Sequence, residues 1–209
     1  MKLYCYADRN QHGHAQKYLL ATLGRFNEFE VVYEPRDGYD SHPVLLEKAK
    51  RVLAFATQAK AAGETSFVWA VNDIVVFKPF RDRLLALLGE NDVMFQSAGG
   101  YICAGFFVAK LNDAFINYWT AVVNKSECYT ILGGTGDQHA ADLLRKMVRL
   151  SLLPEDEFWT PFRQAPAATD KEAVSRWTPC PPPSARLVHM CCVQYPEKLR
   201  ALDHCLALS

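Results

Sequence analysis

Apolar residues along the chain follow two spacings, one typical of strands and one typical of helices. Short runs rich in β-branched and aromatic residues indicate strands, and longer segments with apolar residues every three or four positions indicate helices. The expected strands are Met1–Ala7, Glu30–Tyr33, Phe67–Val71 with its continuation Ile74–Phe77, Val93–Gln96, Tyr101–Lys110, Leu150–Leu153 and Arg186–Met190. The expected helices are Gln16–Leu23, Ser41–Gly63, Arg81–Leu88, Ala114–Val123, Asp137–Val148 and Tyr195–Leu208. Strands that alternate with helices predict an α/β layered domain.

Two local features refine this prediction. Ser41 is expected to cap the N-terminus of its helix, with Pro43 in the first turn, because both residue types favour those positions. The segment 154–183 is rich in proline and follows neither spacing, so we expect an irregular segment over the sheet. The whole chain, 1–209, is expected to form one domain, which suits its length.

The stretch F-V-W-A-V-N-D-I-V-V-F, from Phe67 to Phe77, places one acidic residue between two apolar runs. A carboxylate in apolar surroundings is costly unless it is paired or binds a metal. Asp73 directly follows an expected strand, and ligands of open α/β sheets bind beyond the carboxyl ends of the strands. We therefore expect Asp73 to lie at a functional crevice.

Composition excludes several classes of protein. Lysine plus arginine equals aspartate plus glutamate at 23 each, so the net charge gives no reason to expect nucleic-acid binding. The apolar N-terminus stops at Asp8 and Arg9, too early for a signal peptide. No apolar run reaches the ~18 residues that span a membrane. These features predict a cytoplasmic protein without a transmembrane segment.

The seven cysteines include no C-x-x-C pair. An odd number in a chain without a signal peptide favours reduced thiols over a disulfide framework. The spacing also gives no reason to expect a zinc site.

Three later motifs follow the acidic stretch in order. They are Y-I-C-A-G-F-F-V-A-K from Tyr101, G-D-Q-H-A-A-D from Gly136, and L-V-H-M-C-C-V-Q-Y-P-E-K-L from Leu187. The series, which runs between Val44 and Leu206, resembles the nucleotide-diphospho-sugar transferases of the GT-A type, with their D-x-D, N-A-G, D-Q and late H…K motifs. The resemblance implies a single GT-A-like, Rossmann-like α/β domain with a mixed, mostly parallel sheet flanked by helices.

The resemblance also implies a metal centre. Asp73 matches the second acid of D-x-D and His189 the late histidine, and both are expected to bind Mn²⁺ or Mg²⁺. Lys198 matches the lysine that contacts the diphosphate. A divalent cation neutralises the charge that builds up on the leaving diphosphate, which is why such residues suit this chemistry.

Other residues are implied to bind the donor and to support the reaction. Asp137 and Gln138 match D-Q and are expected to act near the transferred sugar. Gly105 matches the glycine of N-A-G, where a missing side chain lets a sugar approach. Asn72 can offer an oxygen beside Asp73, and Asp8 closes the first strand, where this fold receives the base and ribose.

The expected function is a glycosyltransferase, of hexosyl or pentosyl type, that moves a sugar from a nucleotide-diphosphate donor to a hydroxyl of a glycan, protein or small molecule. Val71 stands where the pattern has its first acid, and Cys103 stands where it has asparagine. These departures keep open an alternative, a GT-A-fold protein that binds nucleotide or sugar without turnover. A nucleotidyltransferase shares the metal chemistry, but the segment after the first strand lacks its glycine-rich signature. No P-loop, G-x-G-x-x-G or G-x-S-x-G motif is present.

Overall fold

The computed structural model of the chain describes residues 1–8, 11–36, 44–131, 136–166, 170–191, 193 and 197–209. The expected helix cap at Ser41 and Pro43 and the glycines at 133–135 lie outside these residues. Within them, strands and helices form one α/β domain, as the alternating pattern predicted.

A mixed sheet forms the centre of the domain. Its strands run in the order β2-β1-β3-β6-β5-β7. The pairs β1–β2, β1–β3 and β5–β7 are parallel, whereas β6 is antiparallel to both β3 and β5. The bounds are Lys2–Asp8 for β1, Glu30–Arg36 for β2, Ser66–Ala70 for β3, Val93–Ala98 for β5, Tyr101–Lys110 for β6 and Leu150–Leu152 for β7.

Strand β3 is buried on both faces of this sheet. Phe67 and Trp69 pack into one hydrophobic cluster, and Val68 and Ala70 pack into the cluster on the other side. Successive side chains of a strand point to opposite faces, so a strand covered on both sides reads as a continuous apolar run. The continuous apolar stretch before Asp73 is therefore explained by a central strand that is buried on both faces.

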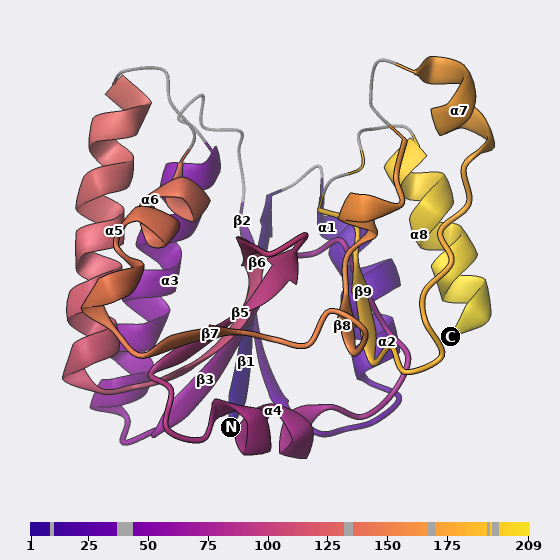
Figure 1. Cartoon of the computed structure of the whole chain (residues 1–209). Coiled ribbons are helices and arrows are strands. Elements are labelled where there is room, and N and C mark those ends of the chain that lie inside the picture. The colour runs from indigo at the N-terminus through magenta and orange to yellow at the C-terminus, as the bar shows by residue number, and fades with distance from the viewer. Residues whose placement is uncertain (9–10, 37–43, 132–135, 167–169, 192, 194–196) are drawn as a thin grey trace.

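Helices cover the sheet on both sides. In Figure 1, α3, α5 and α6 stand together on the left of the sheet, while α2 and α8 stand on the right. The bounds on the left are Val44–Ala61 for α3, Asp113–Ile131 for α5 and Asp137–Leu143 for α6, followed by the 3₁₀ turn η2 at Arg145–Met147. On the right, α1 (His12–His14), the π-helical turn η1 (Ala15–Leu20) and α2 (Ala21–Leu23) follow one another directly, and α8 is Glu197–Leu208. Helix α4, Arg81–Leu88, lies at the lower end.

A second, smaller sheet corrects one expectation. β4, Ile74–Val76, does not continue β3 but pairs with β9, Leu187–His189, in a sheet of order β4-β9-β8, where β8 is Phe158–Trp159. The apolar runs on either side of Asp73 thus belong to different sheets, and Asp73 lies where the chain passes from one to the other. A local pattern cannot show this, because both runs are apolar and buried.

Several element bounds also differ from the expected ones. Helix α5 extends well beyond Val123, while α6 ends at Leu143 instead of continuing to Val148. The proline-rich segment contains β8 (Phe158–Trp159), the turn η3 (Pro161–Arg163) and α7 (Lys171–Arg176) between irregular stretches. Short elements of this kind fall below what periodicity can detect.

Trp119 of α5 lies in the core cluster between the main sheet and helices α3, α5 and α6. Its side chain is fully buried, and its ring lies 6.1 Å from Phe95 and 5.1 Å from Phe107 of the sheet. The indole N–H donates to the carbonyl of Ala49 in α3 at 2.9 Å. One side chain therefore joins two helices to the sheet.

We expect Trp119→Ala to lower the free energy of unfolding by about 3–5 kcal/mol, because a large buried ring leaves a cavity. Trp119→Phe keeps most of the packing and loses only the bond to Ala49, so its loss is smaller. Urea denaturation followed by circular dichroism measures both variants. A loss below about 1 kcal/mol for Trp119→Ala would contradict this account of the core.

Candidate functional site

Asp73 lies in the short connection between the two sheets. The backbone N–H of Val71 donates to the carbonyl of Gly105 at 2.8 Å, and the backbone carbonyl of Asp73 accepts from Met190 N–H at 3.0 Å. These two bonds tie the connection to β6 on one side and to the end of β9 on the other. The side chain of Asp73, 10% exposed, is thereby held at the end of strand β3.

Both oxygens of Asp73 meet a basic side chain from the C-terminal part of the chain. Oδ1 lies 3.2 Å from Nε2 of His189, and Oδ2 accepts a hydrogen bond from Nζ of Lys198 at 2.6 Å. The structure thus brings together three residues that the motifs singled out. The carboxylate that interrupts the apolar stretch is paired, not exposed.

The electrostatics of this cluster follow from burial and pairing. Burial acts to raise the pKa of Asp73, but the charges of His189 and Lys198 outweigh it and hold the pKa below its usual range. Burial acts to lower the pKa of His189, yet the neighbouring Cys103 and Asp73 raise it to about 9. With no metal bound, the cluster is therefore a carboxylate held between an imidazolium and an ammonium group.

Gln96 of β5 orients the imidazole of His189. Its side-chain oxygen lies 2.6 Å from Nδ1 of His189, and its amide nitrogen donates to the carbonyls of Phe158 and Trp159 at 3.2 Å each. The two carbonyls fix the amide, so its oxygen faces the ring and Nδ1–H donates to it. Nε2 then faces Asp73. Gln96 is not among the residues expected from the sequence, since a single glutamine in an apolar strand carries no motif.

Gly105 makes room for this imidazole. A Cβ atom at Gly105 would lie 2.2 Å from Cε1 and 2.8 Å from Nε2 of His189, and 3.1 Å from Cγ2 of Val71. The space that the missing side chain leaves is therefore filled by His189. The same contacts place the Val71 side chain beside the ring, at the edge of the cluster.

Two thiols lie beside the ring of His189, on the side away from Asp73. Cys103 of β6 has its sulfur 3.6 Å from Nδ1, and the ligand atoms of Cys103, His189 and Cys191 all lie within 4.8 Å of one another. A hydrogen bond from Cys191, together with the charge of His189, lowers the pKa of Cys103 well below its usual value despite burial. The cysteines that the structure describes are free thiols. The cysteine spacing, without a C-x-x-C pair, gave no indication that two thiols and a histidine lie together.

Asp137 and Gln138 start helix α6 and face different surroundings. Asp137 is fully buried, and its Oδ2 lies 2.9 Å from Nζ of Lys48 in α3. Burial raises the pKa of Asp137, while Lys48 acts in the opposite direction. Gln138 is exposed and lines a cavity of about 380 Å³ together with Cys103 and Cys191. Of the pair, Gln138 is the one that a ligand in this cavity can reach.

The two remaining predicted residues lie near the same end of the sheet. Asn72 donates a hydrogen bond from its side-chain amide to the side chain of Gln11 at 2.6 Å. Its amide is thus directed to the chain segment that follows β1 and not to the cluster. Asp8 is the last residue of β1 and pairs with Arg36 of β2.

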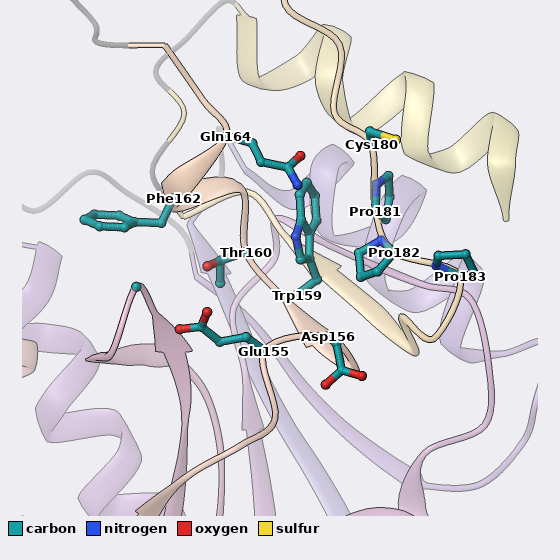
Figure 2. Close-up of a pocket in the computed structure, with 11 residues that line it drawn as sticks. Glu155, Asp156, Trp159, Thr160, Phe162, Gln164, Cys180, Pro181, Pro182 and Pro183 are labelled. Atoms are coloured by element: carbon teal, nitrogen blue, oxygen red, sulfur yellow. The ribbon is translucent and has the colours of Figure 1, made fainter.

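A second cavity, of about 410 Å³, adjoins the first, since Phe162 lines both. Figure 2 shows the Trp159 indole beside Pro181 and Pro182, with Gln164 above it and the carboxylates of Glu155 and Asp156 below. An aromatic ring beside carboxylate and amide groups can hold polar ligands with hydroxyl groups. The proline-rich segment thus supplies most of this cavity's lining.

The donor set between Asp73 and His189 fits a hard divalent cation. Two ligands at right angles around an octahedral ion with bonds of about 2.1 Å lie about 3 Å apart. The Oδ1–Nε2 separation is 3.2 Å. A ligating histidine usually donates its other ring N–H to a carbonyl or carboxylate, and Nδ1 of His189 faces Gln96 in this way. Asp73 and His189 would supply two ligands, and diphosphate and water the rest.

We expect Gly105→Ala to lower the free energy of unfolding by about 1–3 kcal/mol, since the added methyl group must displace the buried ring of His189. Gly13→Ala is the matched control, because Gly13 lies in helix α1 with no atom within 4 Å of an added Cβ. The control should be unchanged or up to about 1 kcal/mol more stable. Equal stabilities measured by thermal denaturation would show that His189 does not fill this space.

We expect the ring of His189 to titrate near 9 in the metal-free protein. Asp73→Asn should lower this pKa, because the carboxylate charge that favours the imidazolium is removed. Nuclear magnetic resonance of the histidine ring against pH measures both values. A wild-type value at or below the ordinary 6.5 would contradict the pairing described above.

Comparison with known proteins reveals similarity in structure but not in sequence. No family model and no curated protein matches the chain. A glycosyltransferase involved in glycosylation of the major capsid of PBCV-1 superposes with a TM-score of 0.66 at 12% identity, over 100% of both chains. The galactosyltransferase LgtC, solved with donor and acceptor sugar analogues, gives 0.54 at 12% identity over 97% of this chain and 95% of its own.

The glycosyltransferase GlyE of Streptococcus pneumoniae gives a TM-score of 0.59 at 14% identity over 90% of this chain. The chain spans 53% of GlyE. Among the described residues, none of the helices has the length and apolar character to cross a bilayer. The mixed α/β fold of this chain is that of GT-A-type glycosyltransferases.

Proposed function

We propose that the protein transfers a sugar from a nucleotide-diphosphate donor to a hydroxyl group, with a divalent cation held by Asp73 and His189. The observation that carries the proposal is the 3.2 Å approach of Asp73 Oδ1 to His189 Nε2 at the end of β3, where α/β sheets bind ligands. A bound Mn²⁺ or Mg²⁺ neutralises charge on the departing diphosphate. The fold shared with known glycosyltransferases supports this class of reaction.

The residues around the cation have separate tasks in this proposal. Asp73 holds the ion through Oδ1, while Lys198, already on Oδ2, turns its ammonium group to the diphosphate oxygens. Gln96 keeps Nδ1 of His189 protonated, so Nε2 is the nitrogen that binds. Because that nitrogen also holds a proton with a pKa near 9, cation affinity rises as the pH is raised from 7 toward 9.

The sugar is expected in the cavity beside Cys103. Gln138 is exposed there and can hydrogen-bond a sugar hydroxyl, whereas Asp137, paired with Lys48, positions the start of helix α6. The adjoining cavity beside Trp159 is the proposed acceptor site (Figure 2). Asp8, the last residue of β1, and Asn72, which follows β3, are proposed to bind the nucleotide of the donor.

A second candidate function is nucleotide binding without turnover. Val71 supports it, because an apolar side chain lies at the edge of the cluster where a second carboxylate would add a metal ligand. Hydrolysis of a panel of nucleotide-diphosphate sugars distinguishes the two functions, since a binder shows affinity with no release of sugar.

We expect Asp73→Asn to abolish Mn²⁺-dependent binding of uridine or guanosine diphosphate, because Asp73 is the one acidic residue of the V-N-D motif from Val71 to Asp73. Val71→Asp should tighten it, because its side chain lies beside the same ring. Calorimetric titration at constant pH measures each affinity, with circular dichroism as a test of folding. Asp82→Asn is the control, since Asp82 is 83% exposed on helix α4. Equal affinities in wild type and a folded Asp73→Asn would overturn the cation site.

A further inference from the structure

We propose that Cys103, Cys191 and His189 form a binding site for Zn²⁺ on the side of His189 that faces away from Asp73. The site uses Nδ1 of the ring, whereas the proposed catalytic cation uses Nε2. Zinc binding itself requires only the three residues and their geometry. Its consequence for catalysis, given below, rests on the proposed function.

The geometry of the three ligands suits zinc. Their ligand atoms lie within 4.8 Å of one another, and Cys103 Sγ lies 3.6 Å from His189 Nδ1. Zinc bonds of about 2.3 Å to sulfur and about 2.0 Å to nitrogen place these two atoms about 3.5 Å apart in a tetrahedron. Two thiolates and one imidazole are also soft and borderline ligands, which favour zinc over Mg²⁺ or Mn²⁺.

The surroundings of the three ligands complete a zinc site. Gln96 Oε1 lies 2.6 Å from Nδ1, too close for two ligands of one tetrahedral ion, so its hydrogen bond with Nδ1 is given up when zinc binds and water takes the fourth position. On the far side of the ring, Nε2–H can donate to Asp73 at 3.2 Å. A carboxylate behind a ligating histidine is the usual support of a zinc-bound imidazole.

An ion can reach these ligands from the cavity. Cys103 and Cys191 both line the cavity of about 380 Å³, and Cys191 is partly exposed. Binding requires both cysteines as thiolates and Nδ1 of His189 without its proton, so any proton on these three atoms is released to solvent. The two negative sulfurs then balance the charge of the ion, so a doubly charged cation adds no net charge to a buried site.

The two sites exclude each other through one ring. When Nδ1 binds zinc, Nε2 keeps its proton and donates it to Asp73, so that nitrogen has no lone pair for a second cation. Zinc should therefore weaken the Mn²⁺-dependent binding of nucleotide diphosphate. Zinc bound beside the cavity that Cys103 lines would therefore inhibit the proposed transferase.

Co²⁺, which replaces zinc in such sites, provides the test. The full chain, kept reduced with a phosphine, is titrated with Co²⁺ and followed by its thiolate-to-metal absorption band in the near ultraviolet. We expect one Co²⁺ per chain and displacement by Zn²⁺. Cys103→Ser and Cys191→Ser should each lose the band, while Cys128→Ser, at an exposed thiol on helix α5, should keep it.

Asp73→Asn separates this proposal from the proposed function. Asp73 supports the zinc site only through the ring, so its loss should weaken Co²⁺ binding by about 10- to 100-fold and leave the band visible. The same variant should lose Mn²⁺-dependent nucleotide binding altogether. If reduced wild type gives no thiolate band, or if Cys103→Ser and Cys191→Ser keep it unchanged, the zinc site is overturned whatever the nucleotide titrations show.

Discussion

A buried carboxylate needs partners, and the pairing of Asp73 determines how the C-terminal part of the chain lies against the main sheet. Leaving a buried charge without its partner costs about 3–5 kcal/mol, a large share of the stability of an ordinary domain. His189 and Lys198 supply the partners from β9 and α8. The small sheet and the terminal helix are thus held at the point where β3 ends, close to Cys103, which lines one of the two cavities. One electrostatic requirement therefore links the fold to the site.

The parts of the fold that the sequence predicted are those set by local pattern. Strand β3 is a continuous apolar run, and helix α3 repeats its apolar residues at helical spacing. Both elements lie near the bounds that these patterns predicted. The partner of β4 was predicted wrongly, because the choice between continuing β3 and joining β9 depends on contacts with residues more than a hundred positions away. The predicted length of α6 was also wrong, because the backbone leaves the helical conformation at Leu144, with φ −94° and ψ 5°.

The site shows the same division between local and distant information. The order of motifs predicted that Asp73, His189 and Lys198 act together, and the structure brings their charged atoms into contact. The motifs could not predict the roles of Gln96, Lys48 or Cys191. Each is a single polar or sulfur-bearing residue whose partner comes from another element. Gly105 was expected to let a sugar approach the backbone, but the group that fills this space in the structure is the imidazole of His189.

The donor atoms on the two sides of His189 differ in kind, and this difference follows from two positions. Val71 removes an oxygen donor from the Asp73 side compared with the acidic motif that the sequence resembles, and Cys103 adds a sulfur on the other side. Loss of oxygen weakens the hold on hard cations, and gain of sulfur strengthens the hold on soft ones. The same ring, held by Asp73 at one nitrogen and by Gln96 at the other, can serve either side but not both. In the two proposals, the nitrogen of His189 that carries the proton therefore decides whether the oxygen side or the sulfur side can bind a cation.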